Sequence, residues 1–132
     1  MRKRILLVLG VMVMMGLLSH ANAARLQHEK VYQEEWCTAM EGESEVRLPD
    51  ATRVDCVTDD YAVEFDFADK WAEAIGQSLH YGNALDKQAM IVLIMERATD
   101  GRYFTRLRDV VKHSCLDITL LCIGRSELCN AP

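Results

Sequence analysis

Hydrophobic residues recur along the chain with two spacings, one typical of helices and one typical of strands. Spacings of three and four residues predict helices over residues 27–40, 68–82 and 103–113. Short runs bounded by turn residues predict three antiparallel strands over residues 45–48, 53–58 and 61–67. A continuous apolar run predicts a central strand covered on both faces over residues 89–95, and a last strand is predicted over residues 116–123.

The order of these elements predicts an α/β protein with a mixed sheet flanked by helices. A strand, a helix and a strand in succession favour a parallel pair joined by a crossover, and the three short strands before them favour an antiparallel meander. No internal repeat, long linker or low-complexity stretch divides the chain. Residues 24–132 are therefore expected to form a single domain.

The first 23 residues have the pattern of a secretory signal peptide. Three basic residues at positions 2–4 precede an apolar run that ends at Leu18, and Ala-Asn-Ala at positions 21–23 supplies a cleavage site. The apolar run is short for a membrane span, and an uncleaved membrane anchor is the alternative. The sequence predicts cleavage before Ala24, a periplasmic or secreted location, and no stable insertion in the membrane after cleavage.

The net charge of the exported part limits the classes of partner that it can bind. Three of the 15 basic residues lie in the signal segment, which leaves 12 basic residues against 20 acidic residues and a formal charge of −8. Broad, non-specific binding of nucleic acid depends on positive surface and is disfavoured. Four arginines nevertheless gather in one short window and are the predicted contacts for a phosphate backbone: Arg97, Arg102, Arg106 and Arg108. Acidic residues in the same window leave a solvated helix of mixed charge as the alternative.

The five cysteines all lie in the exported part, where disulfides are favoured over free thiols: Cys37, Cys56, Cys115, Cys122 and Cys129. They contain no pair spaced C-x-x-C, which disfavours a structural zinc site. Because the number is odd, one thiol is left over or pairs between chains. We expect the tail residue Cys129 to pair with Cys115 or with Cys122.

Acidic residues stand inside two of the predicted strands, where they are uncommon and costly to bury. Alternation places Glu64 and Asp66 on one face of their strand, and it places Asp55 opposite to Val54 and Cys56. If the two strands pair as a hairpin, Asp55 and Glu64 share a face. Two carboxylates on one face repel each other unless they share something cationic.

These residues and the helix after them resemble the PD-(D/E)xK nuclease superfamily, which includes restriction enzymes and Holliday-junction resolvases. The resemblance covers roughly residues 30–95, and its most specific parts are VDCVTDDYAVEFDFADKW and the Gly-Gln-x-x-x-Tyr pattern that starts at Gly76. It implies a restriction-endonuclease-like α-β-β-β-α-β core, here extended by a further helix and strand. In that fold the first helix packs on the sheet, which makes a disulfide between Cys37 and Cys56 feasible.

The resemblance also implies a role for individual residues. Asp55 and Glu64 are expected to bind Mg²⁺, or Mn²⁺, together with the backbone carbonyl of Phe65. The metal activates a water molecule for attack on a phosphodiester, since a hard cation takes oxygen ligands and lowers the pKa of bound water. Gln77 is expected to orient the scissile phosphate or the attacking water. A half-exposed glutamine without such a role is the structural alternative.

One position departs from the family pattern. The lysine expected two residues after Glu64 is Asp66, and we expect Lys70 to replace it from the next helix. Asp66 is assigned to the N-cap of that helix or to the outer shell of the metal; an ion pair of Lys70 with Asp66 or Glu73 is the structural alternative. The predicted function is an exported Mg²⁺-dependent nuclease acting on nucleic acid. The alternative is a catalytically inactive protein of the nuclease fold that serves as a periplasmic binding or structural module.

Overall fold

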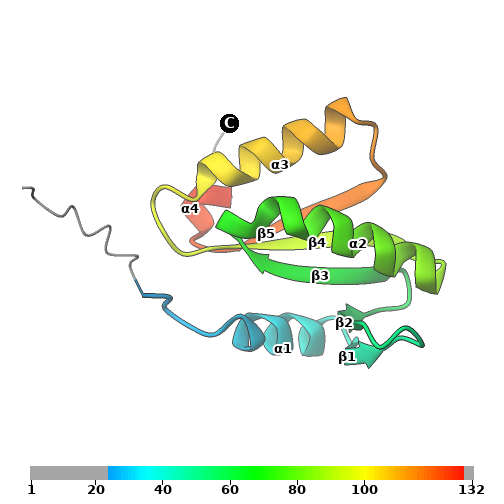
Figure 1. Cartoon of the computed structure of the whole chain (residues 1–132). Helices are drawn as coiled ribbons and strands as arrows, with labels where there is room; N and C mark the ends of the chain where they lie inside the picture. Colours follow the sequence, from blue (N-terminus) through cyan, green and yellow to red (C-terminus); the bar gives the residue numbers. More distant parts are fainter. Residues whose placement is uncertain (1–23, 130–132) are drawn as a thin grey trace, which may run out of the picture.

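A computed structural model of the chain describes residues 24–129, and the predicted signal peptide lies outside the described residues (Figure 1). In chain order the elements are α1 (Glu29–Ala39), β1 (Glu43–Arg47), β2 (Arg53–Val57), β3 (Tyr61–Phe67), the 3₁₀ helix η1 (Ala68–Lys70), α2 (Trp71–Leu85), β4 (Gln88–Met95), α3 (Gly101–His113), β5 (Ile118–Gly124) and α4 (Ser126–Cys129). Every helix and strand predicted from the sequence is present. The short helix α4 is an addition that the pattern of the tail did not indicate.

The strands form one mixed sheet in the order β1-β2-β3-β4-β5. The first three strands pair antiparallel, and β3, β4 and β5 pair parallel. Helix α1 covers one face of the sheet, and α2 and α3 lie on the other face (Figure 1). The predicted α/β architecture with a mixed sheet between helices is confirmed.

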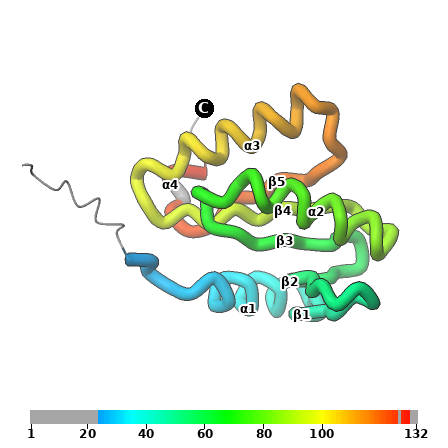
Figure 2. Tube along the Cα trace, viewed as in Figure 1, coloured from blue at the N-terminus to red at the C-terminus, as the bar shows by residue number. Residues whose placement is uncertain are grey.

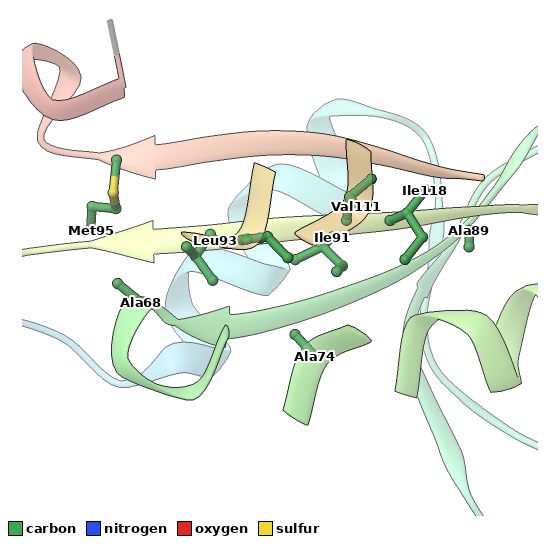
Figure 3. Close-up of a cluster of buried hydrophobic side chains, with 9 residues drawn as sticks. Ala68, Ala74, Ala89, Ile91, Leu93, Met95, Val111 and Ile118 are labelled. Carbon is green, nitrogen blue, oxygen red and sulfur yellow. The ribbon is translucent and has the colours of Figure 1, made fainter. Parts of the chain in front are cut away.

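Strand β4 supplies the centre of the core because both of its faces are covered. Ile91, Leu93 and Met95 pack beneath α2 and α3, with Ala68 and Ala74 among their neighbours (Figure 3). The alternate positions of the same strand pack on the side of α1. All seven residues from position 89 to position 95 are buried, as expected for a strand with helices on both faces.

Two disulfides fasten the periphery to the sheet. Cys37 of α1 is bonded to Cys56 of β2, as expected, and Cys122 of β5 is bonded to Cys129 of α4. Cys115 is a free, exposed thiol. The two disulfides are compatible with an exported protein. Within residues 24–129, no helix is both long enough and apolar enough to cross a membrane.

The carboxyl ends of β3 and β4 lie at the same end of the molecule, because the two strands are parallel. Helices α2 and α3 both begin there and run back along the sheet, as the tube trace in Figure 2 shows. The first turn of α1 reaches the same end from the opposite face (Figure 1). Three helix beginnings and the acidic part of β3 therefore meet at one end of the sheet.

Candidate functional site

The hairpin of β2 and β3 opens where the acidic residues lie. Among the described residues, β2 pairs with β3 only through Cys56 with Val63 and Val57 with Ala62, whereas β3 pairs with β4 over its full length. Beyond the last pair, the backbone N–H of Phe65 donates to Oδ2 of Asp55 at 2.8 Å. The side chain of Asp55 thus takes the place of a strand-to-strand hydrogen bond.

Strand β2 rotates at Asp55, so the prediction that Val54 and Cys56 share a face is wrong. Cys56 packs on the side of α1, and Val54 packs in a separate cluster beneath α2. Opposite Asp55 in β1, Glu45 has a φ of 62°. Gln33 of α1 donates from Nε2 to the carbonyl of Asp55 at 2.6 Å and to Oε1 of Glu45 at 2.9 Å. This buried glutamine satisfies backbone and side-chain acceptors at the point of rotation.

Four carboxyl groups from three elements converge beside the opened hairpin. The side chains of Asp55 and Glu64 hydrogen-bond to each other, and Glu29 at the start of α1 hydrogen-bonds to Asp66. Glu64 and Asp66 are each 4% exposed. We call Glu29, Asp55, Glu64 and Asp66 the acid cluster. The predicted meeting of Asp55 and Glu64 is present in the structure, and two further acids accompany them.

The acid cluster holds its protons strongly. Burial, followed by the charges of Asp55, Asp66 and Glu29, raises the pKa of Glu64 to about 10. Burial and the charge of Glu29 raise the pKa of Asp66 to about 7, although Lys70 acts in the opposite direction. Burial also raises the pKa values of Asp55 and Glu29. Packing four acids together is tolerated only if they share protons or a cation.

Lys70 pairs with Asp66, as the structural alternative expected, and Asp66 does not cap a helix. Nζ of Lys70 lies 3.9 Å from Oδ1 of Asp66, so the lysine contacts Asp66 and not Glu64. Asp66 is buried inside β3, and its Oδ1 accepts the N–H of Phe67. Neither η1 nor α2 has a side-chain cap, so the assignment of Asp66 to a helix N-cap is wrong. The carboxylate satisfies the open edge of β3 instead.

Gln77 is linked to the acid cluster only indirectly, by way of Tyr81. It is exposed, and its side chain hydrogen-bonds to Tyr81, which is 5% exposed. Burial and the charge of Glu64 raise the pKa of Tyr81, while the hydrogen bond of Gln77 lowers it. The predicted orientation of α2 toward the acids is therefore present. The residue next to the acids is Tyr81, with Gln77 behind it at the surface.

Sequence reasoning missed Glu29 and Gln33, both on α1. A signal for them exists, because Glu29, Gln33 and Cys37 are spaced four residues apart and lie on one helix face. Cys37 was expected to bond to β2, which identifies that face as the inner one. Extending the spacing toward the N-terminus would have placed Gln33 and Glu29 beside the sheet.

The four predicted arginine contacts divide into separate groups. The guanidinium groups of Arg102 and Arg106 lie 4.7 and 5.6 Å from the ring centroid of Tyr103. Burial raises the pKa of Asp69 in η1, but the hydrogen bond and charge of Arg25 and the charge of Arg97 lower it overall. Arg108 lies 4.0 Å from Asp109. We therefore separate Arg108 from the three arginines that the structure relates to η1 or to Tyr103.

The donor set at the opened hairpin consists of oxygens. Among residues 24–129, no group of three or more His, Cys, Asp or Glu side chains is arranged to hold a metal ion. The pair Asp55 and Glu64 offers two carboxylates. The carbonyl of Phe65 points to the same strand edge as its N–H, which donates to Asp55. Mg²⁺ is commonly held by one or two carboxylates, with water and substrate phosphates completing its shell, so the residues present fit this ion in chemical type.

Comparison with protein-family models, curated proteins and solved structures finds no match for this chain.

Proposed function

We propose that this protein is an exported Mg²⁺-dependent nuclease of the PD-(D/E)xK type, with Asp55 and Glu64 as its metal ligands. The observation that carries the proposal is the meeting of these two carboxyl groups at the point where β2 and β3 separate. Acids are costly to bury, and two of them in contact need a shared proton or a shared cation, so Mg²⁺ can take the place of the proton. The element order from α1 to β4 supports the restriction-endonuclease-like core that the resemblance implies.

The surrounding residues support a hydrolytic site in distinct ways. A bound Mg²⁺ would polarise a phosphate and lower the pKa of coordinated water. Lys70 places a half-exposed ammonium group near Asp66, where it can balance negative charge and contact a phosphate from the solvent side. Gln77 is exposed beside Tyr81 and offers an amide to a substrate oxygen.

A specific observation favours the second candidate, a binding or structural module without catalysis. Asp55 and Asp66 already accept the N–H groups of Phe65 and Phe67 along the open edge of β3. An acid in the family's lysine position is also a departure from the catalytic pattern. In this alternative the carboxylates close a strand edge and need no metal.

The deciding experiment combines cleavage with metal binding. The purified protein is incubated with single-stranded DNA, double-stranded DNA and RNA in Mg²⁺, Mn²⁺ or EDTA, beside the variants Asp55→Asn and Glu64→Gln. We expect metal-dependent cleavage that both variants lose. We also expect Mg²⁺ to raise the melting temperature of the wild type and to do so less in either variant, because ligand binding stabilises the folded state.

Glu34→Gln is the matched control, because Glu34 is an exposed acid of α1 whose partner is Lys30 at 3.6 Å. It should cleave and respond to Mg²⁺ like the wild type. Lys70→Gln tests the lysine separately: cleavage that survives this change rejects its role but leaves the metal site intact. A wild type that neither cleaves nor gains stability with metal overturns the nuclease proposal in favour of the module.

A further inference from the structure

We propose that the first two turns of α3 bind single-stranded nucleic acid through a ridge made of Arg102, Tyr103 and Arg106. This inference rests on the proposed function, because it names the class of substrate that the acid cluster would receive. The ridge combines two exposed guanidinium groups with a partly exposed aromatic ring. Such a pairing of cations with a stacking surface is typical of sites for single strands.

Helix geometry places the ridge on the side of α3 that faces α2. Leu107 and Val111 mark the buried stripe of α3. At 100° per residue, Tyr103 and Arg106 lie on one flank of that stripe, and Arg102 lies farther round on the same side, almost opposite to the stripe. Strand β4, α3 and the parallel strand β5 form a crossover, and the usual right-handed connection turns this flank toward α2.

The ridge therefore lies near the end of the sheet that holds the acid cluster. Helices α2 and α3 begin together at the carboxyl ends of β3 and β4 (Figure 2), and η1 contacts α3. Lys70, at the end of η1, is half exposed, and its Nζ lies 3.9 Å from Oδ1 of Asp66. A strand that crosses η1 can meet cations on the ridge and at Lys70 before it reaches Asp55 and Glu64.

The contacts of Tyr103 favour a base as the occupant. The guanidinium of Arg102 lies over the ring, and its Nη2 donates to the tyrosine hydroxyl at 2.8 Å. Unstacked bases bind to aromatic rings and to the planes of arginine guanidinium groups, so either layer of this stack can receive one. Bases inside a duplex are already stacked and paired, and they do not offer a face to the ridge.

Charge also favours a short single strand over a duplex. The described cations at this end are few, and the exported part carries a formal charge of −8. Duplex binding that relies on phosphate contacts alone uses a broad positive surface, which an acidic protein lacks. A few cations together with stacking are sufficient for a strand of several nucleotides.

The test measures binding without cleavage. The purified protein in EDTA is titrated into dye-labelled oligo-dT, oligo-U and a DNA duplex of equal length, and fluorescence anisotropy is read at several salt concentrations. We expect the single strands to bind more tightly than the duplex. Tyr103→Leu should weaken oligo-dT binding about 5- to 150-fold, because stacking on an aromatic ring is worth about 1–3 kcal/mol per base.

Two kinds of variant separate the ridge from general effects. Tyr103→Phe keeps the ring and should bind oligo-dT like the wild type, so a loss in Tyr103→Leu alone comes from the ring and not from the hydroxyl; an unchanged melting temperature of Tyr103→Leu excludes misfolding. Arg102→Gln and Arg106→Gln should each reduce the slope of log affinity against log salt by about 0.7. Arg108→Gln removes the same charge from the opposite flank of the helix and should leave the slope unchanged.

Several outcomes would overturn the inference. They are duplex binding as tight as single-strand binding, an unchanged affinity in Tyr103→Leu, or equal binding of poly-glutamate, which would make the ridge a site for acidic polypeptides. Its failure is distinguishable from failure of the proposed function. A protein that cuts with Mg²⁺ but prefers duplex keeps the nuclease and loses the ridge. A protein that binds single strands but neither cuts nor binds metal keeps the ridge alone.

Discussion

The parallel and antiparallel halves of the sheet are stabilised in different ways. In the parallel half, β4 pairs along its length with β3 and β5, and its apolar side chains are covered on both faces. In the antiparallel half, β2 leaves β3 after Cys56 and Val63, and side-chain carboxylates accept the N–H groups of the exposed edge. Burial of apolar side chains is sufficient to stabilise the parallel half. The second half carries groups that titrate and can bind a ligand.

This contrast predicts that pH changes the stability of the protein through the antiparallel half. It is the largest of the effects that we predict. Without divalent metal, stability should fall as pH rises from 5 to 8. The pKa of Glu64 is raised to about 10 and that of Asp66 to about 7, whereas acids in an unfolded chain titrate near pH 4. The folded chain therefore keeps protons that the unfolded chain has released. Each such acid should lower the free energy of unfolding by at most about 1.4 kcal/mol per pH unit. For Asp66 this decrease ends near pH 7, and for Glu64 it continues toward pH 10.

Melting temperatures in EDTA across this pH range measure the effect. Glu64→Gln removes one titrating group, so its melting temperature should fall less steeply with pH than that of the wild type. Glu34→Gln, at an exposed position of α1, should keep the wild-type slope. Saturating Mg²⁺ should flatten the wild-type slope, since metal replaces protons between the carboxylates. A wild type whose stability is independent of pH contradicts the picture of a protonated acid cluster.

The same contrast explains which predictions the sequence could support. Alternation and apolar runs identified β3 and β4, because every residue of a paired strand has a face set by its neighbours. The rule failed at Val54, where β2 rotates around Asp55. It also could not place Asp66, since a helix cap and an edge carboxylate have the same local sequence. The four-residue spacing back from Cys37 could have placed Glu29 beside the sheet, but local periodicity could not show that its partner there is Asp66 of β3.

The disulfides allow a second comparison between the halves, with an intermediate expected effect. The Cys37–Cys56 bond joins residues 19 positions apart, and the Cys122–Cys129 bond joins residues 7 positions apart. Chain entropy predicts that removing the first costs about 3 kcal/mol and removing the second about 2 kcal/mol. Urea unfolding of the serine double variants measures both values.

The metal response makes this comparison sharper. Cys37 fixes the face of α1 that carries Glu29 and Gln33, so the variant without the Cys37–Cys56 bond should also lose most of its stabilisation by Mg²⁺. The variant without the Cys122–Cys129 bond should keep that stabilisation, because this bond joins α4 to β5. Equal loss of the Mg²⁺ effect in both variants would show that α1 does not position the acids.

The smallest predicted effect concerns Gln33, which holds β2 in its rotated position. Gln33→Leu keeps the side-chain size but removes the donor to the carbonyl of Asp55, at 2.6 Å, and to Glu45. A buried acceptor left without its partner costs about 1–3 kcal/mol, and Glu45 still has Arg53 at 2.7 Å. We expect urea unfolding to show a loss in this range and the Mg²⁺-induced rise in melting temperature to shrink. Glu34→Leu introduces the same residue at an exposed position of α1 and should change neither quantity beyond about 0.5 kcal/mol. If Gln33→Leu loses stability but keeps the full Mg²⁺ response, the rotation of β2 is a packing feature and Asp55 reaches its position without the glutamine.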